Sequence, residues 1–351
     1  MPKLLNQVRS FLEQQWSRLK PTSPGRKQKE AEVNKAIERI VDQVDPRIRG
    51  LMGYRRKLFP AVERALDYSN ELAQRLPGPV QVDRKNWSED PVVNSLFGSV
   101  DQLRWCLTGP EVRKFVKGSS VGTDLFYGLL LAFPHERNQL GMDLAQGQVR
   151  RDVKQTVMSF TNQEVVLPGE TEAEVRLAVV GGILDTIVGI AVEETAAQEE
   201  RIASIEEQLR MLRLKQKVAR PRAQGIELLG EGNAIHVQEY ESLVKRIAEL
   251  EKDLADNRRG LETVDDYLDR VAALLLHPER LLGADLTKVR MDRMNIVREG
   301  KGEEELGRDV EFLRGRRNGQ PGRVVLLIRF PRSEIIDEKV RRAEMERYLN
   351  L

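Results

Sequence analysis

Cysteine is almost absent from this chain of 351 residues, which contains only Cys106. A single cysteine forms no disulfide within the chain and builds no thiolate metal site. Architectures that depend on either are excluded, and we expect a protein of a reducing compartment, the cytoplasm. The N-terminal segment is interrupted by charges and has no apolar core of a secretory signal.

Aromatic residues are also scarce, and neither sign of charge is in large excess. Aromatics make up 5% of the chain, whereas charged residues make up 32%. This composition fits long solvated helices better than a compact all-β fold. The 57 basic and 55 acidic residues leave a net charge of +2, so the total does not demand a polyanionic partner.

No hydrophobic run reaches the length of a membrane span. The most apolar stretch, Leu177 to Val192, has 16 residues and contains Asp185. A helix needs about 20 apolar residues to cross a bilayer. We therefore expect a helix buried against a sheet and no transmembrane segment.

Catalytic and cofactor motifs are missing as well. His135, His236 and His277 are isolated, and none has a further ligand at metal-binding spacing. The glycine-rich pieces around Gly230 and Gly300 lack the order of a phosphate loop or of a dinucleotide fingerprint. We therefore predict no enzyme, with no catalytic, cofactor-binding or metal-binding residue.

What is present predicts a mainly helical α+β protein. An antiparallel β body is interrupted in sequence by a long helical hairpin. The expected parts are a terminal amphipathic helix (1–20), a linker (21–30), a helical region (31–120), the β body (121–170 plus 284–332), the helical hairpin (171–276) and a C-terminal helix (333–351).

The β body is expected from short apolar or alternating segments. These lie at 125–133, 138–145, 151–160 and 163–167, with Gly147 and Asn162 as candidate turn residues. A later hairpin is expected around 315–322. Apolar residues point both ways in Val324 to Phe330, which is typical of a strand covered on both faces.

A coiled coil is expected over about 193–275. The first helix carries apolar residues spaced by three and four, and Arg220-Pro221 should end it. The second helix should run from about 234 to 276, with Val244 on its seam and one irregular step between Ile247 and Leu250. The first seam is Ile202, Ile205, Leu209 and Leu212.

Folding the two helices about residue 228 pairs their seams. Leu212 should then meet Val244, and Leu209 should meet Ile247. The charges agree with this register. Lys215 and Lys217 should lie near Glu239 and Glu241, and Glu199 and Glu200 should lie near Arg258 and Arg259.

The tip of this hairpin, about 218–236, is the predicted contact site for a protein partner. Four apolar residues fall in a loop expected to be exposed: Ile226, Leu228, Leu229 and Ile235. The leading hypothesis is a cytoplasmic scaffold or interaction protein that presents a coiled-coil arm.

The alternative is a nucleic-acid-associated protein that uses two basic clusters. The candidate phosphate-binding residues are Arg213, Lys217, Arg220 and Arg222 near the tip, and Arg314, Arg316 and Arg317 around the late β-turn. Helix-end cations suit the helix dipole in any case, and stacking aromatics are missing beside both clusters. The protein-partner hypothesis is therefore favoured.

Overall fold

The computed structural model describes residues 26–336, except 121, 146–147, 227–232, 259–262, 293, 299–306 and 318. Its contacts divide the chain into two compact units. The first contains Leu66–Asp185 and the described part of Glu279–Leu351, and the second contains 26–65 and Thr186–Pro278. The predicted terminal helix at 1–20 lies outside the described residues, as does 337–351 of the predicted C-terminal helix.

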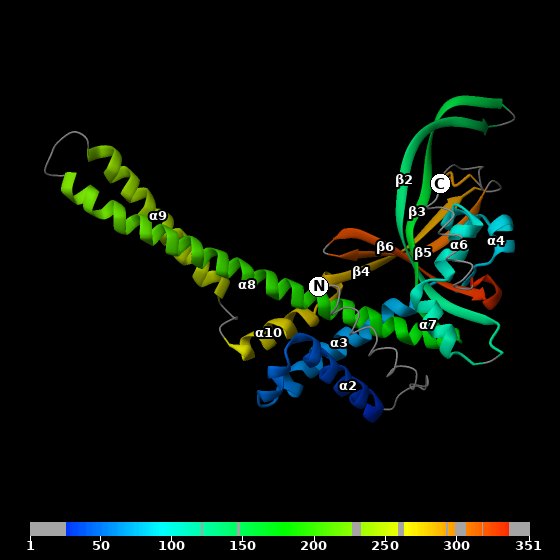
Figure 1. The fold of residues 1–351 in the computed structure, drawn as a ribbon, viewed down its shortest axis with the longest axis horizontal. Helices are drawn as coiled ribbons and strands as arrows, with labels where there is room; N and C mark the ends of the chain where they lie inside the picture. Colours follow the sequence, from blue (N-terminus) through cyan, green and yellow to red (C-terminus); the bar gives the residue numbers. More distant parts are fainter. Residues whose placement is uncertain are drawn as a thin grey trace. The chain divides into compact units, whose positions relative to one another are not determined.

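The first unit is built on one six-stranded sheet (Figure 1). The order β3-β2-β6-β5-β4 is antiparallel, and the short β1 pairs with β6 in parallel. Strands from before and after the helical region therefore share a sheet, and the predicted α+β class is confirmed. The strands are β1 (Val80–Gln81), β2 (Leu125–Ala145), β3 (Gln148–Gly169), β4 (Leu282–Met291), β5 (Arg308–Arg317) and β6 (Gln320–Pro331).

The β2–β3 hairpin is longer than predicted, because bulges interrupt its sequence pattern without ending its strands. The register shifts at three places, and β3 has a residue with positive φ at each: Asp152, Asn162 and Leu167. Asn162, predicted as a turn residue, is thus part of a bulge. Bulges bend a strand and increase its twist, which accounts for the curl of β2 and β3 in Figure 1.

Four short helices cover one face of this sheet. They are α4 (Arg84–Glu89), α5 (Pro91–Leu96), α6 (Val100–Leu107) and α7 (Pro110–Gly118). Asp83, Asp90 and Ser99 accept hydrogen bonds from backbone N–H groups in the first turns of α4, α5 and α6.

The core between these helices and the sheet is rich in aromatic residues. Phe126, Phe312 and Phe330 are almost fully buried, and the Phe160 and Phe312 rings meet edge to face at 5.9 Å. Trp87 packs on this core and donates its indole N–H to the Phe97 carbonyl oxygen at 2.8 Å. On β6, Leu327 is buried on the face opposite Leu326 and Ile328.

The second unit is helical. Its elements are α2 (Arg26–Val44), η1 (Pro46–Gly50), the first part of α3 (Tyr54–Gln74), most of α8 (Glu172–Ile226), α9 (Asn233–Arg258) and α10 (Val264–Leu275); the short α11 (Pro278–Leu281) follows. Helix α2 begins inside the segment predicted as a linker. Pro60 lies within α3.

The lengths of the long helices differ from the prediction. Helix α8 continues through Pro221 to Ile226, so the predicted end at Arg220-Pro221 is wrong, although a proline inside a helix removes a hydrogen bond and crowds the preceding turn. The second helix was predicted to reach 276, but α9 ends at Arg258 and α10 is a separate helix. A coiled coil extending to 275 is therefore wrong.

Helix α8 contains the apolar stretch that the sequence analysis singled out. Among the described residues, it is the one helix whose length and hydropathy suit a membrane crossing, and 50% of the apolar window is buried within the structure. Val179, Leu184 and Val188 are among its buried residues. This burial is what the expected core helix requires.

Candidate functional site

The contact between α8 and α9 is the first feature on which a function was predicted. Ile205 and Leu209 of α8 are buried against Ile247 and Leu250 of α9, with Leu212 and Leu254 packed beside them. Figure 1 shows α9 running along the distal part of α8. One turn before Ile202 on α8, the Gln198 side-chain amide donates to the Asn257 carbonyl oxygen of α9 at 3.0 Å.

The seam of α9 is more regular than predicted. Val244, predicted on the seam, is 41% exposed, whereas Leu243 is partly buried, so Leu243 lies nearer the buried side of α9. The half-buried or buried positions of α9 are Tyr240, Leu243, Ile247, Leu250, Leu254 and Asn257. These are spaced by three and four throughout, and the irregular step disappears.

Ion pairs link the two helices, and one of them differs from the predicted combination. Arg213 of α8 pairs with Glu251 of α9 at 2.7 Å. Arg258 pairs with Glu206, about two turns along α8 from the predicted Glu199. Arg213, a candidate phosphate-binding residue, therefore already contacts a carboxylate.

A second face of α8 carries apolar side chains into solvent. Met211, Leu214 and Val218 are 51%, 53% and 63% exposed, and we call these three residues the outer face of α8. They recur at three and four positions, so they share one side of the helix, offset from the seam. A shallow hollow of about 320 Å³ runs beside Met211, where Glu207, Gln208, Leu212 and Arg246 also line it.

Cations surround the outer face. Lys215 and Lys217 are exposed, and Arg210 lies one turn before Leu214, where it pairs with Glu207 at 2.9 Å. From Leu209 to Ile226 the sequence contains six basic residues and no acidic residue. This part of α8 thus combines exposed apolar atoms with positive charge.

The predicted tip residues are only partly within the described structure. Ile226 is the last residue of α8, and Ile235 lies in the first turn of α9, so neither belongs to a loop. Leu228 and Leu229 lie outside the described residues. Arg220 and Arg222 belong to the helical backbone of α8, and their side chains are likewise outside the description.

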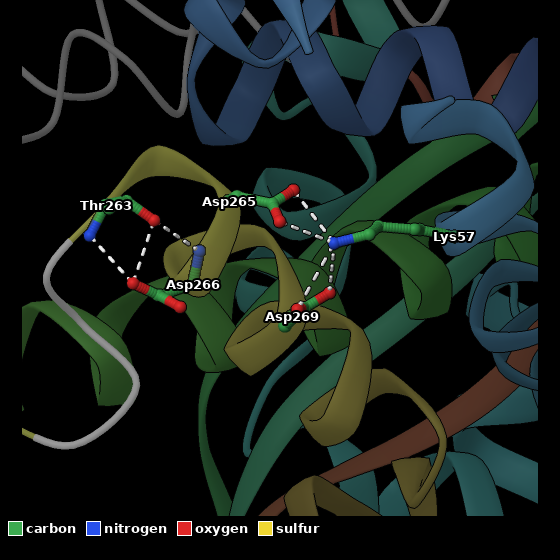
Figure 2. A network of polar contacts seen from close by, with 5 residues as sticks. All are labelled: Lys57, Thr263, Asp265, Asp266 and Asp269. Carbon is green, nitrogen blue, oxygen red and sulfur yellow. Dashed lines mark hydrogen bonds and ion pairs between the residues drawn. The ribbon is translucent and has the colours of Figure 1, made fainter. Parts of the chain in front are cut away.

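The acidic run near the start of α10 has a structural role (Figure 2). Thr263 and Asp266 form a capping box that begins α10. The Lys57 ammonium group donates to Asp265 at 2.8 Å and to Asp269 at 3.1 Å, which ties α3 to α10 within the second unit. Hydrogen bonds to these carboxylates raise the pKa of Lys57.

The Arg-rich β-turn is largely neutralised by acidic side chains. Arg316 pairs with Asp285 at 2.8 Å, and Arg314 approaches Glu136 at 3.5 Å. Arg323 approaches Glu164 at 3.5 Å and lies 4.9 Å above the Phe133 ring. Arg317, the third predicted residue here, is exposed at the end of β5 and also has an interaction partner. These contacts reduce the positive charge that a phosphate would meet.

Reactive groups are sparse in the part of the chain that the structure describes. No group of three His, Cys, Asp or Glu side chains there is placed to hold a metal ion. Burial raises the pKa of the Cys106 thiol to about 12, so the thiolate is negligible at neutral pH. His135 and His277 are exposed, and His236 lies in the first turn of α9.

Comparison of the chain with protein-family models, with curated proteins and with solved structures finds no match in any of the three.

Proposed function

We propose that this protein is a non-enzymatic interaction protein of the cytoplasm, in which α8 and α9 form an antiparallel coiled-coil hairpin that binds a protein partner. The buried residues of the two helices support the hairpin. Pairing Leu209 with Ile247 also aligns Ile205 with Leu250 and Ile202 with Leu254. Knobs-into-holes packing requires this steady spacing on both helices.

The outer face of α8 is the single observation that carries the proposed function. Its three large apolar side chains are each more than half exposed and share one side of two helical turns. Burial of apolar surface is favourable by about 25 cal/mol per Å². A contiguous exposed patch that a partner covers gains this free energy on binding.

Charge defines the kind of partner that fits. The outer face is flanked by Arg210, Lys215 and Lys217. A helix with apolar residues spaced by three and four and with acidic flanking residues complements both features. The proposed partner segment is therefore an acidic amphipathic helix, and the apolar tip residues remain a second proposed contact.

The nucleic-acid alternative has weaker support. Its β-turn arginines face Glu136 and Asp285, and Arg213 faces Glu251. A phosphate would have to compete with these carboxylates for each guanidinium group. The cations of the outer face are accompanied by aliphatic side chains, whereas binding of single strands commonly uses aromatic stacking.

Photocrosslinking at position 214 tests the proposal. A photoreactive amino acid replaces Leu214 in the full-length chain in cells, and the crosslinked peptide is sequenced. We expect a protein segment with the pattern of an acidic amphipathic helix. The triple variant with Met211, Leu214 and Val218 changed to Ser should lose this partner, whereas the matched variant Met52→Ser, at a residue fully exposed in the second unit, should retain it.

Other results would redirect or end the proposal. If the triple variant retains the partner and deletion of 227–232 removes it, the contact lies at the tip. Recovery of nucleic acid in a salt-dependent manner would favour the alternative function. A helical segment without acidic residues would contradict the assigned partner chemistry.

A further inference from the structure

The β2–β3 hairpin continues well beyond the sheet. Pairing of β2 with β6 ends at Ala132 with Val324, whereas pairing of β2 with β3 continues to Ala145. We call the part from Phe133 onward in β2, with its partner residues in β3, the distal ribbon. Among the described residues, no strand pairs with the other edge of β2 in this ribbon.

The hydrogen bonds of β3 show which backbone groups of β2 are free. On its outer edge, β3 donates from the Met158 N–H to the Asn295 oxygen and accepts at the Thr156 oxygen from the Val297 N–H. The backbone N–H and C=O groups of Thr156 and Met158 therefore point away from β2. Their partners Asn138 and Glu136 form non-hydrogen-bonded pairs with them, because the two kinds of pair alternate along an antiparallel ladder.

The open edge of β2 therefore presents the N–H and C=O groups of three alternate residues. These are Glu136, Asn138 and Leu140, the last of which is paired with Lys154. Pro134 occupies the preceding position of this edge and has no N–H to offer, so the open edge begins after it. An edge with regularly spaced free donors and acceptors is a template for another strand.

The β2 strand of the distal ribbon is exposed, whereas Met158 and Phe160 of its β3 strand are buried in the core of the first unit. The side chains from His135 to Leu140 are exposed, and Leu140 and Met142 are each 66% exposed. Residues 295–297 pair with the outer edge of β3 near Val157, and beyond this point the ribbon has two strands, which alone are marginally stable in water. Addition of strands at the open edge would stabilise it.

We propose that two copies of this chain associate through the open edges of their β2 strands, antiparallel about Asn138. Asn138 then pairs with its own counterpart, and Glu136 of each copy pairs with Leu140 of the other. All three free backbone positions are used in this register. The two ribbons become one four-stranded sheet in the order β3-β2-β2-β3, with two-fold symmetry.

The side chains of the edge fit a second copy. In this register Arg137 lies opposite Gln139 and His135 lies opposite Gly141, so no like charges stand directly across from one another. Met142 lies opposite Pro134 of the second copy, next to Leu140, which joins three apolar residues on each side of the axis. A strand of another protein would have to reproduce this pattern, whereas a second copy already carries it.

The oligomeric state of the full-length chain tests the inference. Sedimentation equilibrium over a wide concentration range should show a reversible dimer. Asn138→Pro removes the N–H that faces the open edge and leaves the bonds to β3 intact. Because two symmetric hydrogen bonds are lost, we expect dimerisation to weaken by about tenfold to a hundredfold. Asn138→Ser retains the N–H and is the matched control.

Cysteine crosslinking tests the register. Residues in a hydrogen-bonded pair have Cα atoms about 5.5 Å apart, within the range that a disulfide bridges. Asn138→Cys should therefore form a disulfide-linked dimer on mild oxidation, whereas Gln139→Cys, whose counterparts are diagonal and more than about 7 Å apart, should not.

Three outcomes would overturn the inference. They are a chain that stays monomeric at all concentrations, a dimer that Asn138→Pro leaves unchanged, and equal crosslinking at positions 138 and 139. Exchange of backbone amide hydrogens in β3 separates the first result from misfolding, because an intact hairpin keeps its amides protected. None of these measurements depends on the outer face of α8.

Discussion

The sheet core of the first unit and the seam between α8 and α9 both join segments that are far apart in the sequence, but they differ in depth. The sheet core buries Phe126, Phe312 and Phe330 almost completely beneath four helices. The seam buries only Ile205, Leu209, Ile247 and Leu250, and its neighbours are half exposed. A shallow seam holds two helices together while most of their surface stays exposed, and this surface is where we place partner binding.

The largest expected effect is in the sheet core. Phe312→Ala should destabilise the first unit by about 3–5 kcal/mol, because it leaves a cavity and removes the ring contact with Phe160. Urea unfolding followed by tryptophan fluorescence measures it, since Trp87 packs on this core. Leu286→Ala, at a side chain that is 55% exposed on β4, is the control. Similar losses for the two variants would mean that the core is not deep.

A smaller effect is expected in the seam. Leu209→Ala should cost about 2 kcal/mol, the lower end for buried leucines, because the site is open to solvent nearby. Hydrogen exchange of the α9 amides should accelerate while protection of the sheet stays unchanged. Leu214→Ala changes a residue of the outer face, five positions along α8, and should change stability by less than about 0.5 kcal/mol. Equal losses would show that the outer face is already covered within the protein.

The sequence predicted the class of fold, because apolar spacing is a local signal. It predicted the separation of the strands by helices and the helical seam on α8 for the same reason. Strand order was not predictable, since pairing of β2 with β6 joins residues separated by the whole helical region. The bulges at Asp152, Asn162 and Leu167 made one strand resemble several short pieces.

The error in the seam of α9 arose because the sequence offered two apolar residues for one seam position. Leu243 and Val244 are adjacent and both apolar. Only Leu243 keeps the alternation of three-residue and four-residue steps along α9. The end of α9 has a signal that was missed, because Thr263 followed by Asp266 is a capping box. The outer face is also visible as spacing in the sequence, but its exposure depends on which helices pack against α8.

The end of the distal ribbon, around Gly141, extends the comparison to a more exposed region. The Gln155 amide donates to the Met142 oxygen at 2.9 Å, and a Cβ on Gly141 would clash with the Gln155 side-chain oxygen. Gly141→Ala should displace this side chain and cost about 1 kcal/mol, the value of one hydrogen bond. In a Gln155→Ala background the same change should cost almost nothing. Additive costs in a double-mutant cycle followed by thermal unfolding would contradict the close approach.

The smallest effect is expected from polar contacts at the surface of the second unit. The Tyr54 hydroxyl donates to Glu38 at 2.6 Å, and Arg55 and Arg49 also donate to this carboxylate. These hydrogen bonds lower the pKa of Glu38 below its ordinary value of 4.5, with Tyr54 as the largest cause. Tyr54→Phe should therefore raise the pKa of Glu38, which a carboxyl NMR titration measures directly.

The sign of the accompanying change in stability follows from linkage. A carboxyl group whose pKa is lowered by folding contributes stability above its unfolded pKa and loses it as the pH falls through the folded pKa. The wild-type chain should thus exceed Tyr54→Phe in stability at neutral pH, and part of the difference should disappear below about pH 4.5. Because Glu38 is about one-third exposed, the change should be much smaller than in the seam. A pKa of Glu38 that Tyr54→Phe leaves unchanged would show that the arginines alone hold this carboxylate, and the contact between α2 and α3 would then depend on charge rather than on the tyrosine hydroxyl.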